Sequence, residues 1–541
     1  MPVFIEMLLI FLTMLMETPI KEPYQQTYLK LFWALLFSVT LFRMAIVGSF
    51  GLGTDESHYV LFSRHLAWGY FDHPPMVAFL AALTTLAGDE VFFVRLGPII
   101  CAAITLVVLR FLALALYRDE RVAFWATVLM LFMPYQHLLA VALLPDATLN
   151  LFWCGALLAA WYAIKDGKWP AWVLLGFLTG GALLSKYHAV LLPLCLFCYL
   201  LASPGRRFWL GRIQPYAAGL IALLVFLPNI LWNAEHNWVS YAFQLSHGGG
   251  GHFSIVKALA VLGGQMGVWS PVIFGLLIAA FISMAREHPL SESDRFVLWT
   301  SLPVFLFFCG IGTFGKILPH WPSVGWWTGS LAVISVTMRK FSKRDRAGIR
   351  WRRWCVTGAI VGFVMTGFLY LGLFVPVVDP LYSRARDLSI MLNRHFPAIK
   401  RLEPFKSQDD ITNILFGWDE ITKRVEEIRS RMPNPEKTFV FCHRFYTTSR
   451  IAVYLHPKTE ATTLRSKFDQ YRLWFSAEGH RGWDALFVVE DRAVKRSKRY
   501  MPLFREMDPE PVKIEVFRKG QIAHTLSVFR YYGFKGKYEG T

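Results

Sequence analysis

The 541-residue chain has few charged residues and few cysteines. Charged side chains make up 17% of it, whereas about 25% is usual in soluble domains. Six of the seven cysteines stand in apolar runs, so the sequence shows neither a disulfide framework nor a metal-type cysteine cluster. This composition argues against a disulfide-stabilised secreted domain and against an ordinary soluble protein.

The sequence also lacks a concentrated basic run. Its net charge is +18, but residues 1–378 hold 26 Lys and Arg against 17 Asp and Glu, and the remainder holds 30 against 21. Each part therefore carries +9, which we interpret as cytoplasmic anchoring charge plus a tail that faces anionic lipid or glycolipid. Membrane lipids are expected partners, and nucleic acid is not.

Long apolar runs are what the sequence has in abundance. Eleven runs are candidates for membrane spans, and they lie at 31–49, 93–117, 122–139, 145–165, 170–185, 189–203, 213–232, 254–283, 295–313, 318–338 and 354–377. We therefore predict an N-terminal segment at 1–30, a transmembrane domain of about 11 helices at 31–378, and a soluble domain at 379–541.

Lysine and arginine are divided unequally between the two alternating sets of connecting segments. One set holds eighteen of these residues and the other holds five. Because cytoplasmic loops are enriched in positive charge, we predict that the first set and the N-terminus are cytoplasmic. The segment at 51–92 and the C-terminal domain then lie on the outer side.

The segment at 51–92 is too polar for lipid and unusually aromatic for a solvated loop. Its ionisable residues include Asp55, Glu56, His58, Asp72 and His73. Helical spacing over 57–68 and 76–86, with two prolines between them, predicts two interfacial helices that lie in the plane of the membrane surface.

Further polar residues stand at the outer ends of later apolar runs. They are Asp146, Lys186, Tyr187, His188, Lys316 and His320. Because ionisable groups at membrane depth are costly and usually functional, we predict that these turns line one outward-facing cavity. The alternatives are that Asp55 and Asp146 cap helices, that Lys186 extends its ammonium to the surface, and that the histidines only pack.

This set of residues suits one type of reaction. A carboxylate such as that of Asp55 can remove a proton from an acceptor hydroxyl as the hydroxyl attacks a lipid-borne electrophile. A phosphate leaving group needs cationic or hydrogen-bonding partners, for which Lys186, Lys316, His320 and His73 are candidates. The residues therefore predict transfer of a group from a lipid phosphate at the outer surface.

The tail is predicted to form a small α/β domain. Short apolar runs predict strands at Thr438–Cys442, Ile451–Leu455 and Ala485–Glu490. Amphipathic spacing predicts helices at Arg384–Lys400 and Asp419–Arg431.

The order of the outer motifs resembles a known family. The chain contains, in this order, TDESHY, GYFDHPP, LPDA, LLSKYHAVL and GKILPHWP. This order is similar to that of the bacterial membrane glycosyltransferases of family 39, which are related to protein O-mannosyltransferases, and of the lipid A aminoarabinose and galacturonic acid transferases. The resemblance covers about residues 30–340. The tail segments FGWDEI and FDQYRLW also resemble the tails of bacterial members.

The resemblance implies a GT-C fold in the bacterial inner membrane with a periplasmic C-terminal domain. It implies inverting transfer of a sugar from a polyprenyl-phosphate donor to a cell-envelope acceptor. Asp55 would be the catalytic carboxylate with Glu56 beside it, and Asp146 would be a second acidic residue. The implied contacts to the donor phosphate are Lys186, Lys316 and His320. Some relatives bind a divalent cation in this cavity, but the resemblance supplies no ligand set for one.

The further candidates for this cavity are His58, Asp72, His73 and Tyr187. His73 stands where the aminoarabinose transferases have a lysine, so the same donor sugar is not implied. Two alternatives to a lipopolysaccharide or lipid A type of acceptor remain. The acceptor could be a protein serine or threonine, or the chain could move lipid-linked sugars across the membrane. The absence of internal repeats counts against transport.

Overall fold

The computed structural model describes residues 23–249, 252–315, 317–343, 345–374, 378–395 and 410–540. The chain divides into two compact units. The first unit comprises residues up to 46, residues 67–80 and residues 95–368, and the second comprises 47–66, 81–94 and 369–541. Two pieces of the first outer loop thus belong to the same unit as the predicted C-terminal domain. The predicted N-terminal segment lies mostly outside the described residues.

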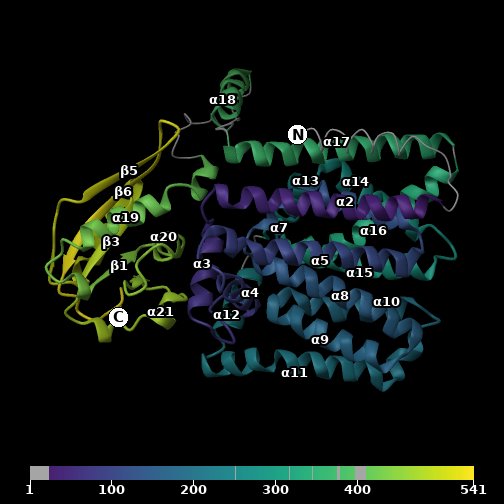
Figure 1. Cartoon of the computed structure of the whole chain (residues 1–541), viewed down its shortest axis with the longest axis horizontal. Coiled ribbons are helices and arrows are strands. Elements are labelled where there is room, and N and C mark those ends of the chain that lie inside the picture. The colour runs from purple at the N-terminus through teal and green to yellow at the C-terminus, as the bar shows by residue number, and fades with distance from the viewer. Residues whose placement is uncertain are drawn as a thin grey trace. The chain divides into compact units, whose positions relative to one another are not determined.

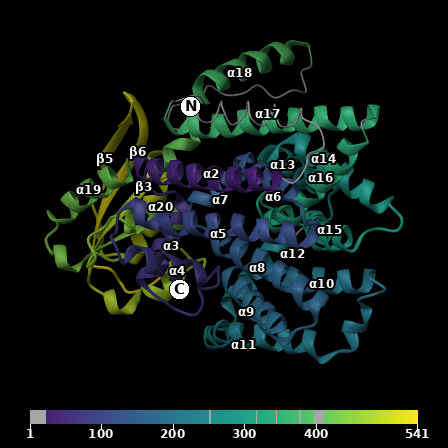
Figure 2. The ribbon, with the colours of Figure 1, turned by 45° about the vertical axis from the view of Figure 1, so that its right-hand side comes forward.

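The first unit is helical (Figures 1 and 2). Its helices are α2 (Pro23–Ile46), α5 (Val91–Tyr117), α6 (Glu120–Leu131), α7 (Pro134–Val141), α8 (Pro145–Asp166), α9 (Trp169–Ser185), α10 (Leu191–Ala202), α11 (Ile213–Glu235), α12 (Val239–Gly249), α13 (Ile255–Trp269), α14 (Pro271–Ala285), α15 (Glu292–Gly312), α16 (Gly325–Ser342) and α17 (Arg346–Phe374). The short helices η2 (Tyr187–Val190) and η4 (Trp321–Val324) precede α10 and α16.

Each of the eleven predicted apolar runs falls on a helix or a helix pair. Among the described residues, six helices are long and apolar enough to cross a membrane, namely α2, α5, α8, α11, α15 and α17. Two further runs form the bent pairs α6–α7 and α13–α14, with angles of 81° and 115°. Pro134 and Pro271 open the second helix of each pair, and the residue before a proline disfavours helical geometry. The protein is a multi-pass helical membrane protein, and a total of eleven spans stays a prediction.

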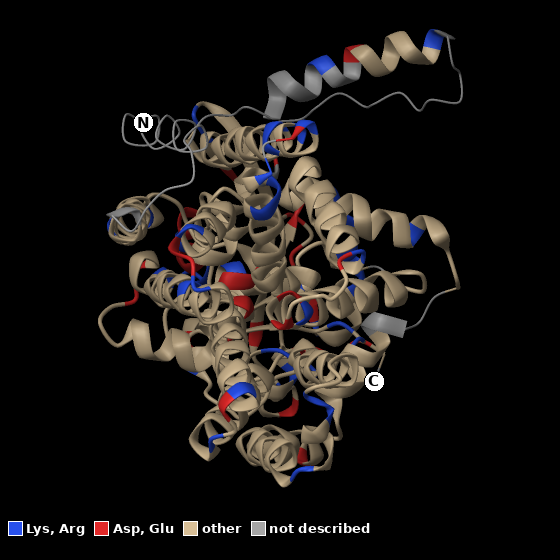
Figure 3. Cartoon of the chain, turned by 90° about the vertical axis from the view of Figure 1, so that its right-hand side faces the viewer, with Lys and Arg blue, Asp and Glu red and all other residues tan. Residues whose placement is uncertain are grey.

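Most of the ribbon is uncharged, and the charged residues stand in short scattered segments (Figure 3). Arg206, in the turn after α10, donates a 3.2 Å hydrogen bond to the carbonyl of Ile164 near the end of α8 and pairs with Glu292 of α15 at 2.5 Å. Asp294 at the start of α15 pairs with Arg339 at 2.8 Å. Ion pairs of this kind join neighbouring helices at their ends without placing charge against lipid.

Two glycines one helical turn apart allow α9 and α11 to approach closely. A Cβ atom at Gly176 would lie 2.7 Å from the carbonyl oxygen of Ala218, and one at Gly180 would lie 2.5 Å from Cβ of Val225. Small residues at this spacing permit backbone contact between membrane helices. This contact holds α9 in place, and Lys186 directly follows the end of that helix.

We expect Gly180→Ala to destabilise the protein by about 1–3 kcal/mol, because the added methyl group overpacks the contact with Val225. Thermal unfolding of the purified protein in detergent measures the effect. Gly219→Ala on α11 is the matched control, since a Cβ atom there meets nothing within 4 Å. Equal melting temperatures for the two variants would contradict the close packing of α9 on α11.

The second unit contains a six-stranded sheet and helices on its two faces. The strands are β1 (Thr438–Cys442), β2 (Ala461–Thr463), β3 (Asp484–Glu490), β4 (Glu506–Met507), β5 (Val512–Arg518) and β6 (Gln521–Tyr532). They follow the order β2-β1-β3-β6-β4, with β5 also on β6; the first three are parallel and β6 is antiparallel to β3. The main helices are α3 (Thr54–Arg64), α18 (Val378–His395), α19 (Trp418–Arg429), α20 (Phe445–Ala452), α21 (Tyr471–Trp474) and α22 (Ser497–Tyr500). Helix α4 (Met76–Thr85) continues from the first unit into the second.

Alternation along the strands separates two cores. Val440 and Cys442 of β1 face a mostly aliphatic core with α19, whereas Phe439 and Phe441 face an aromatic core on the other side of the sheet. Two of these strands were predicted, since β1 and β3 match the expected strands almost residue for residue.

One predicted strand is wrong. The segment Ile451–Leu455 forms the end of α20 and the turn after it. Ile451 and Leu455 both enter the aliphatic core although they are four residues apart, which is the spacing of a helical turn. The predicted helix at Arg384–Lys400 begins earlier, at Val378, and its last five residues lie outside the described part of the chain.

Candidate active site

A buried ion pair joins the start of α8 to the end of α9. Nζ of Lys186 lies 2.8 Å and 3.0 Å from the two carboxylate oxygens of Asp146. The side chains are 7% and 2% exposed. Leu144 is the N-cap of α8, so Asp146 does not cap the helix, and the buried ammonium of Lys186 does not extend to the surface. The two alternatives considered for these residues are therefore wrong.

Two histidines lie beside this pair. The ring of His320 stacks on Tyr135, with centroids 5.6 Å apart and an interplanar angle of 13°. His188 packs against Trp321 with ring centroids 5.0 Å apart. Both histidines lie close enough to Asp146 and Lys186 to interact with their charges. Turns that are far apart in the sequence therefore meet near the ion pair, and that they line one outward-facing cavity stays a prediction.

The first outer loop adds residues to the same place. Nδ1 of His73 lies 3.4 Å from the carboxylate of Asp72, and His73 lies near enough to His320 for the two rings to interact electrostatically. The hydroxyl of Tyr187 lies 2.6 Å from that of Ser240. We call the group Asp72, His73, Asp146, Lys186, Tyr187, His188 and His320 the outer-turn cluster. Lys316 lies outside the described residues, and its part in the site stays a prediction.

Several neutral residues of this region were missed by sequence reasoning. The amide of Gln244 donates a 2.6 Å hydrogen bond to the carbonyl of Asp72. Asn229 donates to the carbonyl of Trp68 at 2.8 Å and accepts from Tyr241 at 3.1 Å. An amide inside an apolar run is a usable signal, because it must find hydrogen-bond partners there.

A divalent cation has no evident ligand set in the described part of the chain. There, no group of three or more His, Cys, Asp or Glu side chains is arranged to hold a metal ion. The Asp146 carboxylate already accepts both of its close contacts from Lys186. No step of the reaction proposed below depends on a metal ion.

We expect Lys186→Met alone to destabilise the protein by about 3–5 kcal/mol, because it leaves the carboxylate of Asp146 buried without its counter-charge. The double variant Asp146→Leu/Lys186→Met removes both charges and should recover most of that loss. Thermal unfolding in detergent compares the single variants, the double variant and the unmodified chain. Single variants as stable as the unmodified protein would contradict a stabilising pair.

Asp55 and Glu56 stand in the first turn of α3, which belongs to the second unit. Gly53 is the N-cap, and its amide donates a 2.8 Å hydrogen bond to the carboxylate of Glu56. Glu56 is buried and supplies one half of a capping box, because its carboxylate accepts the amide of the N-cap residue, while Asp55 is exposed. The alternative that Asp55 is the cap of this helix is wrong.

Helix α3 packs against α20 of the tail domain. His58 is buried with its ring 4.6 Å from that of Phe62 and 5.5 Å from that of Phe445. Arg64 donates to the carbonyl of Val453 at 2.9 Å. The amide of Gly51 donates to the carbonyl of Leu415 at 2.8 Å. The tail domain therefore fixes both ends of the segment that carries Asp55.

We expect Gly51→Ala to disturb this attachment, because the new Cβ atom would lie 2.8 Å from the carbonyl oxygen of Leu415. Limited proteolysis should then cut between α3 and α4 faster than in the unmodified protein. Gly48→Ala is the matched control, since a Cβ atom there meets nothing within 4 Å. Identical cleavage rates in the two variants would show that the Gly51 contact does not hold α3.

Solved structures define the class of the fold. The structure of ArnT from Cupriavidus metallidurans in the apo state covers 92% of this chain and 97% of its own, with a TM-score of 0.57 at 14% identity. The same protein bound to undecaprenyl phosphate gives a TM-score of 0.56 at 14% identity. The archaeal oligosaccharyltransferase AglB from Archaeoglobus fulgidus covers 87% of this chain and 71% of its own, with a TM-score of 0.51 at 11% identity. The chain thus has the predicted GT-C fold.

Sequence comparison identifies particular relatives. Residues 72–232 match the family described as dolichyl-phosphate-mannose-protein mannosyltransferase. The lipid A galacturonosyltransferase RgtD of Rhizobium johnstonii is 26% identical over 300 residues, which are 54% of this chain and 62% of the relative. The undecaprenyl phosphate-alpha-4-amino-4-deoxy-L-arabinose arabinosyl transferase of Pseudomonas paraeruginosa is 30% identical over 225 residues, which are 36% of this chain and 39% of the relative. These matches confirm the resemblance predicted from the outer motifs, and they span less than two thirds of the relatives' own lengths.

Proposed function

We propose that this protein is an inverting glycosyltransferase of the bacterial inner membrane. It transfers one sugar from a polyprenyl-phosphate donor to a periplasmic glycolipid of the lipopolysaccharide or lipid A type. The observation that carries the proposal is the outer-turn cluster, which holds a buried lysine and two histidines at the ends of membrane helices. The names of the relatives, which act on lipid A or use an undecaprenyl-phosphate sugar, support the same donor and acceptor classes.

The donor phosphate binds at Lys186 in this proposal. Its ammonium has three N–H donors, and two of them are directed at Asp146. The third can be given to a phosphate oxygen, with His320 as a further partner. Asp146 then has a positioning role, since it holds the ammonium at the outer end of α9. Lys316 is proposed as a second cation for the same phosphate.

Asp55 is the proposed general base. It accepts the proton of the acceptor hydroxyl while the hydroxyl oxygen forms a bond to the anomeric carbon of the donor sugar. The bond between that carbon and the phosphate oxygen breaks, and polyprenyl phosphate leaves with the electron pair. Lys186 and His320 stabilise the negative charge of the leaving phosphate. Attack opposite the leaving group inverts the anomeric centre.

Three carboxylates were predicted in the catalytic site, and their surroundings distinguish them. Glu56 is buried and accepts the amide of Gly53. Asp146 is buried against Lys186. Asp55 is exposed in the first turn of α3, where an acceptor hydroxyl can reach it. Glu56 is therefore assigned to the helix start and Asp146 to the lysine, and Asp55 to the proton transfer.

We expect Asp55→Asn to lower transfer at least a hundredfold, because general base catalysis typically contributes about 10²–10⁴-fold. Mass spectrometry of envelope glycolipids from a deletion strain that expresses each variant is the measurement. Asp89→Asn, an exposed carboxylate of the same outer loop, is the control and should restore modification fully. Full modification with Asp55→Asn would overturn the assignment of the base. A sugar found on a protein fraction instead of the glycolipids would overturn the acceptor class.

A further inference from the structure

The tail domain has a second polar site at the carboxyl ends of its parallel strands. In the order β2-β1-β3, the chain leaves β1 toward β2 on one side and then returns to β3 on the other side. The loops after β1 and β3 therefore diverge and leave a crevice between them, which is where open α/β sheets bind their ligands. A cavity of about 280 Å³ lies there.

The charge of this crevice is strongly positive. Its lining includes Arg444 after β1, Arg492 and Arg496 after β3, and only one carboxylate, Glu490. Arg492 already pairs with Glu490 at 2.6 Å. Across the described part of the chain, neither Arg444 nor Arg496 has a carboxylate within ion-pair distance. Two guanidinium groups thus remain in the crevice without an anion supplied by the protein.

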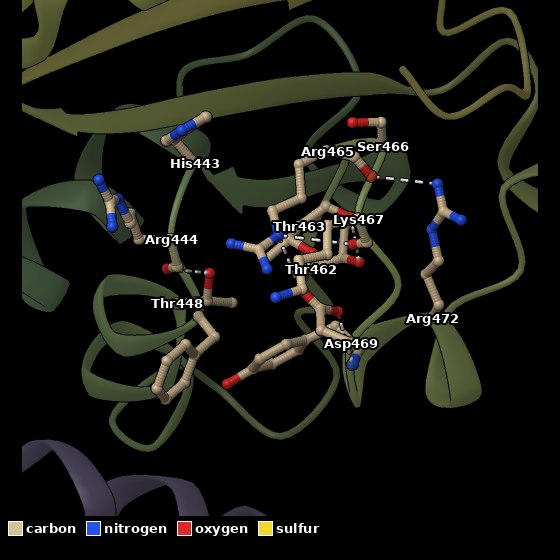
Figure 4. A network of polar contacts seen from close by, with 12 residues as sticks. His443, Arg444, Thr448, Thr462, Thr463, Arg465, Ser466, Lys467, Asp469 and Arg472 are labelled. Atoms are coloured by element: carbon tan, nitrogen blue, oxygen red, sulfur yellow. Dashed lines mark hydrogen bonds and ion pairs between the residues drawn. The ribbon is translucent and has the colours of Figure 1, made fainter. Parts of the chain in front are cut away.

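More cations surround these two. Arg465, which follows β2, extends toward His443 and Arg444 (Figure 4). The pKa of the His443 imidazole is lowered to about 4. Burial is the largest cause, and the guanidinium groups of Arg496 and Arg444 and their neighbours add to it. At pH 7 the imidazole is therefore neutral, and its Nδ1 lies 2.7 Å from the hydroxyl of Tyr500.

The first turn of α20 opens on the same crevice. Arg444 is the N-cap of this eight-residue helix, and no side chain caps its amides. Tyr446 and Thr447 of its first turn line the cavity. Free amide groups and the helix dipole at such an end favour a bound anion. Arginine side chains suit a phosphate in particular, because the guanidinium group presents two parallel N–H donors.

We propose that this crevice is a binding site for a phosphate monoester carried on a sugar, held by Arg444 and Arg496 and by the first turn of α20. A cavity of about 280 Å³ is near the lower end of the range for small-molecule sites, which suits one phosphorylated sugar unit. The shared chemistry could come from the headgroup of a phosphorylated glycolipid or from a soluble sugar phosphate. The site does not depend on the transfer reaction proposed above, since none of its residues takes part in it.

The test is the binding of glucosamine 1-phosphate to the purified full-length protein in detergent, measured by isothermal titration calorimetry. Parallel titrations use glucosamine, inorganic phosphate, and mixed micelles of lipid A with and without its phosphate groups. Arg444→Gln/Arg496→Gln is the test variant. Arg424→Gln/Arg431→Gln removes the same charge from exposed positions at α19 and is the matched control.

We expect the test variant to lose at least tenfold in affinity for glucosamine 1-phosphate, and the control to stay within twofold of the unmodified protein. Glucosamine should not bind, and inorganic phosphate should bind more weakly than the sugar phosphate. Tighter binding of phosphorylated lipid A, lost in the test variant, identifies a glycolipid as the source; equal binding of the soluble ester identifies a free sugar phosphate.

Equal affinities in the two double variants would overturn the site, because binding would then occur elsewhere, for example at Lys186. Binding of glucosamine as tight as that of its phosphate would overturn the ligand class. The double variant Arg444→Lys/Arg496→Lys tests whether a loss of binding in the Gln variant comes from misfolding. It keeps the charge but not the paired N–H donors, so its affinity should lie between those of the unmodified protein and the Gln variant.

Discussion

The buried ion pair of Asp146 and Lys186 is the constraint on which the packing of α8 and α9 around the candidate site depends. Two opposite charges that are almost inaccessible to water must stay together, since separating them leaves an uncompensated charge in the interior. The pair ties the start of α8 to the end of α9, and the close glycine contact of α9 with α11 keeps that end in place. The residues proposed to meet a lipid phosphate are arranged around this pair, so the same interaction serves both packing and the site.

The tail domain packs against the helix that carries Asp55, although the two are far apart in the sequence. Helix α3 precedes the tail by more than 300 residues but packs on α20 within the same compact unit. The segment with Asp55 is thus held by main-chain hydrogen bonds and aromatic packing to the tail. The carboxylate proposed as the base needs a fixed position, and the contacts with the tail hold the helix that carries it. The cationic crevice at the first turn of α20 gives this domain a second proposed role, namely recognition of a phosphate.

Polar groups are paired differently in the helical unit and in the tail domain. In the helical unit, amides and charges find partners elsewhere in that unit, as Asn229 and Glu292 do. In the tail, Arg444 and Arg496 face an open crevice and have no carboxylate partner among the described residues. The first arrangement is what a membrane protein needs for stability. The second arrangement places two positive charges close together, which destabilises the folded domain through repulsion but strengthens the binding of an anionic ligand.

The sequence by itself determined the class of the protein, its apolar helices and the strands β1 and β3, because hydrophobic runs and alternation are local properties. It also determined which ionisable residues stand at outer turns, since their cost in lipid makes them conspicuous. Only the tertiary structure decided that Asp146 pairs with Lys186, that Glu56 caps α3, and that Ile451–Leu455 is helical. These depend on contacts between residues far apart in the chain, or on which face of the core a residue meets, and no local pattern specifies either.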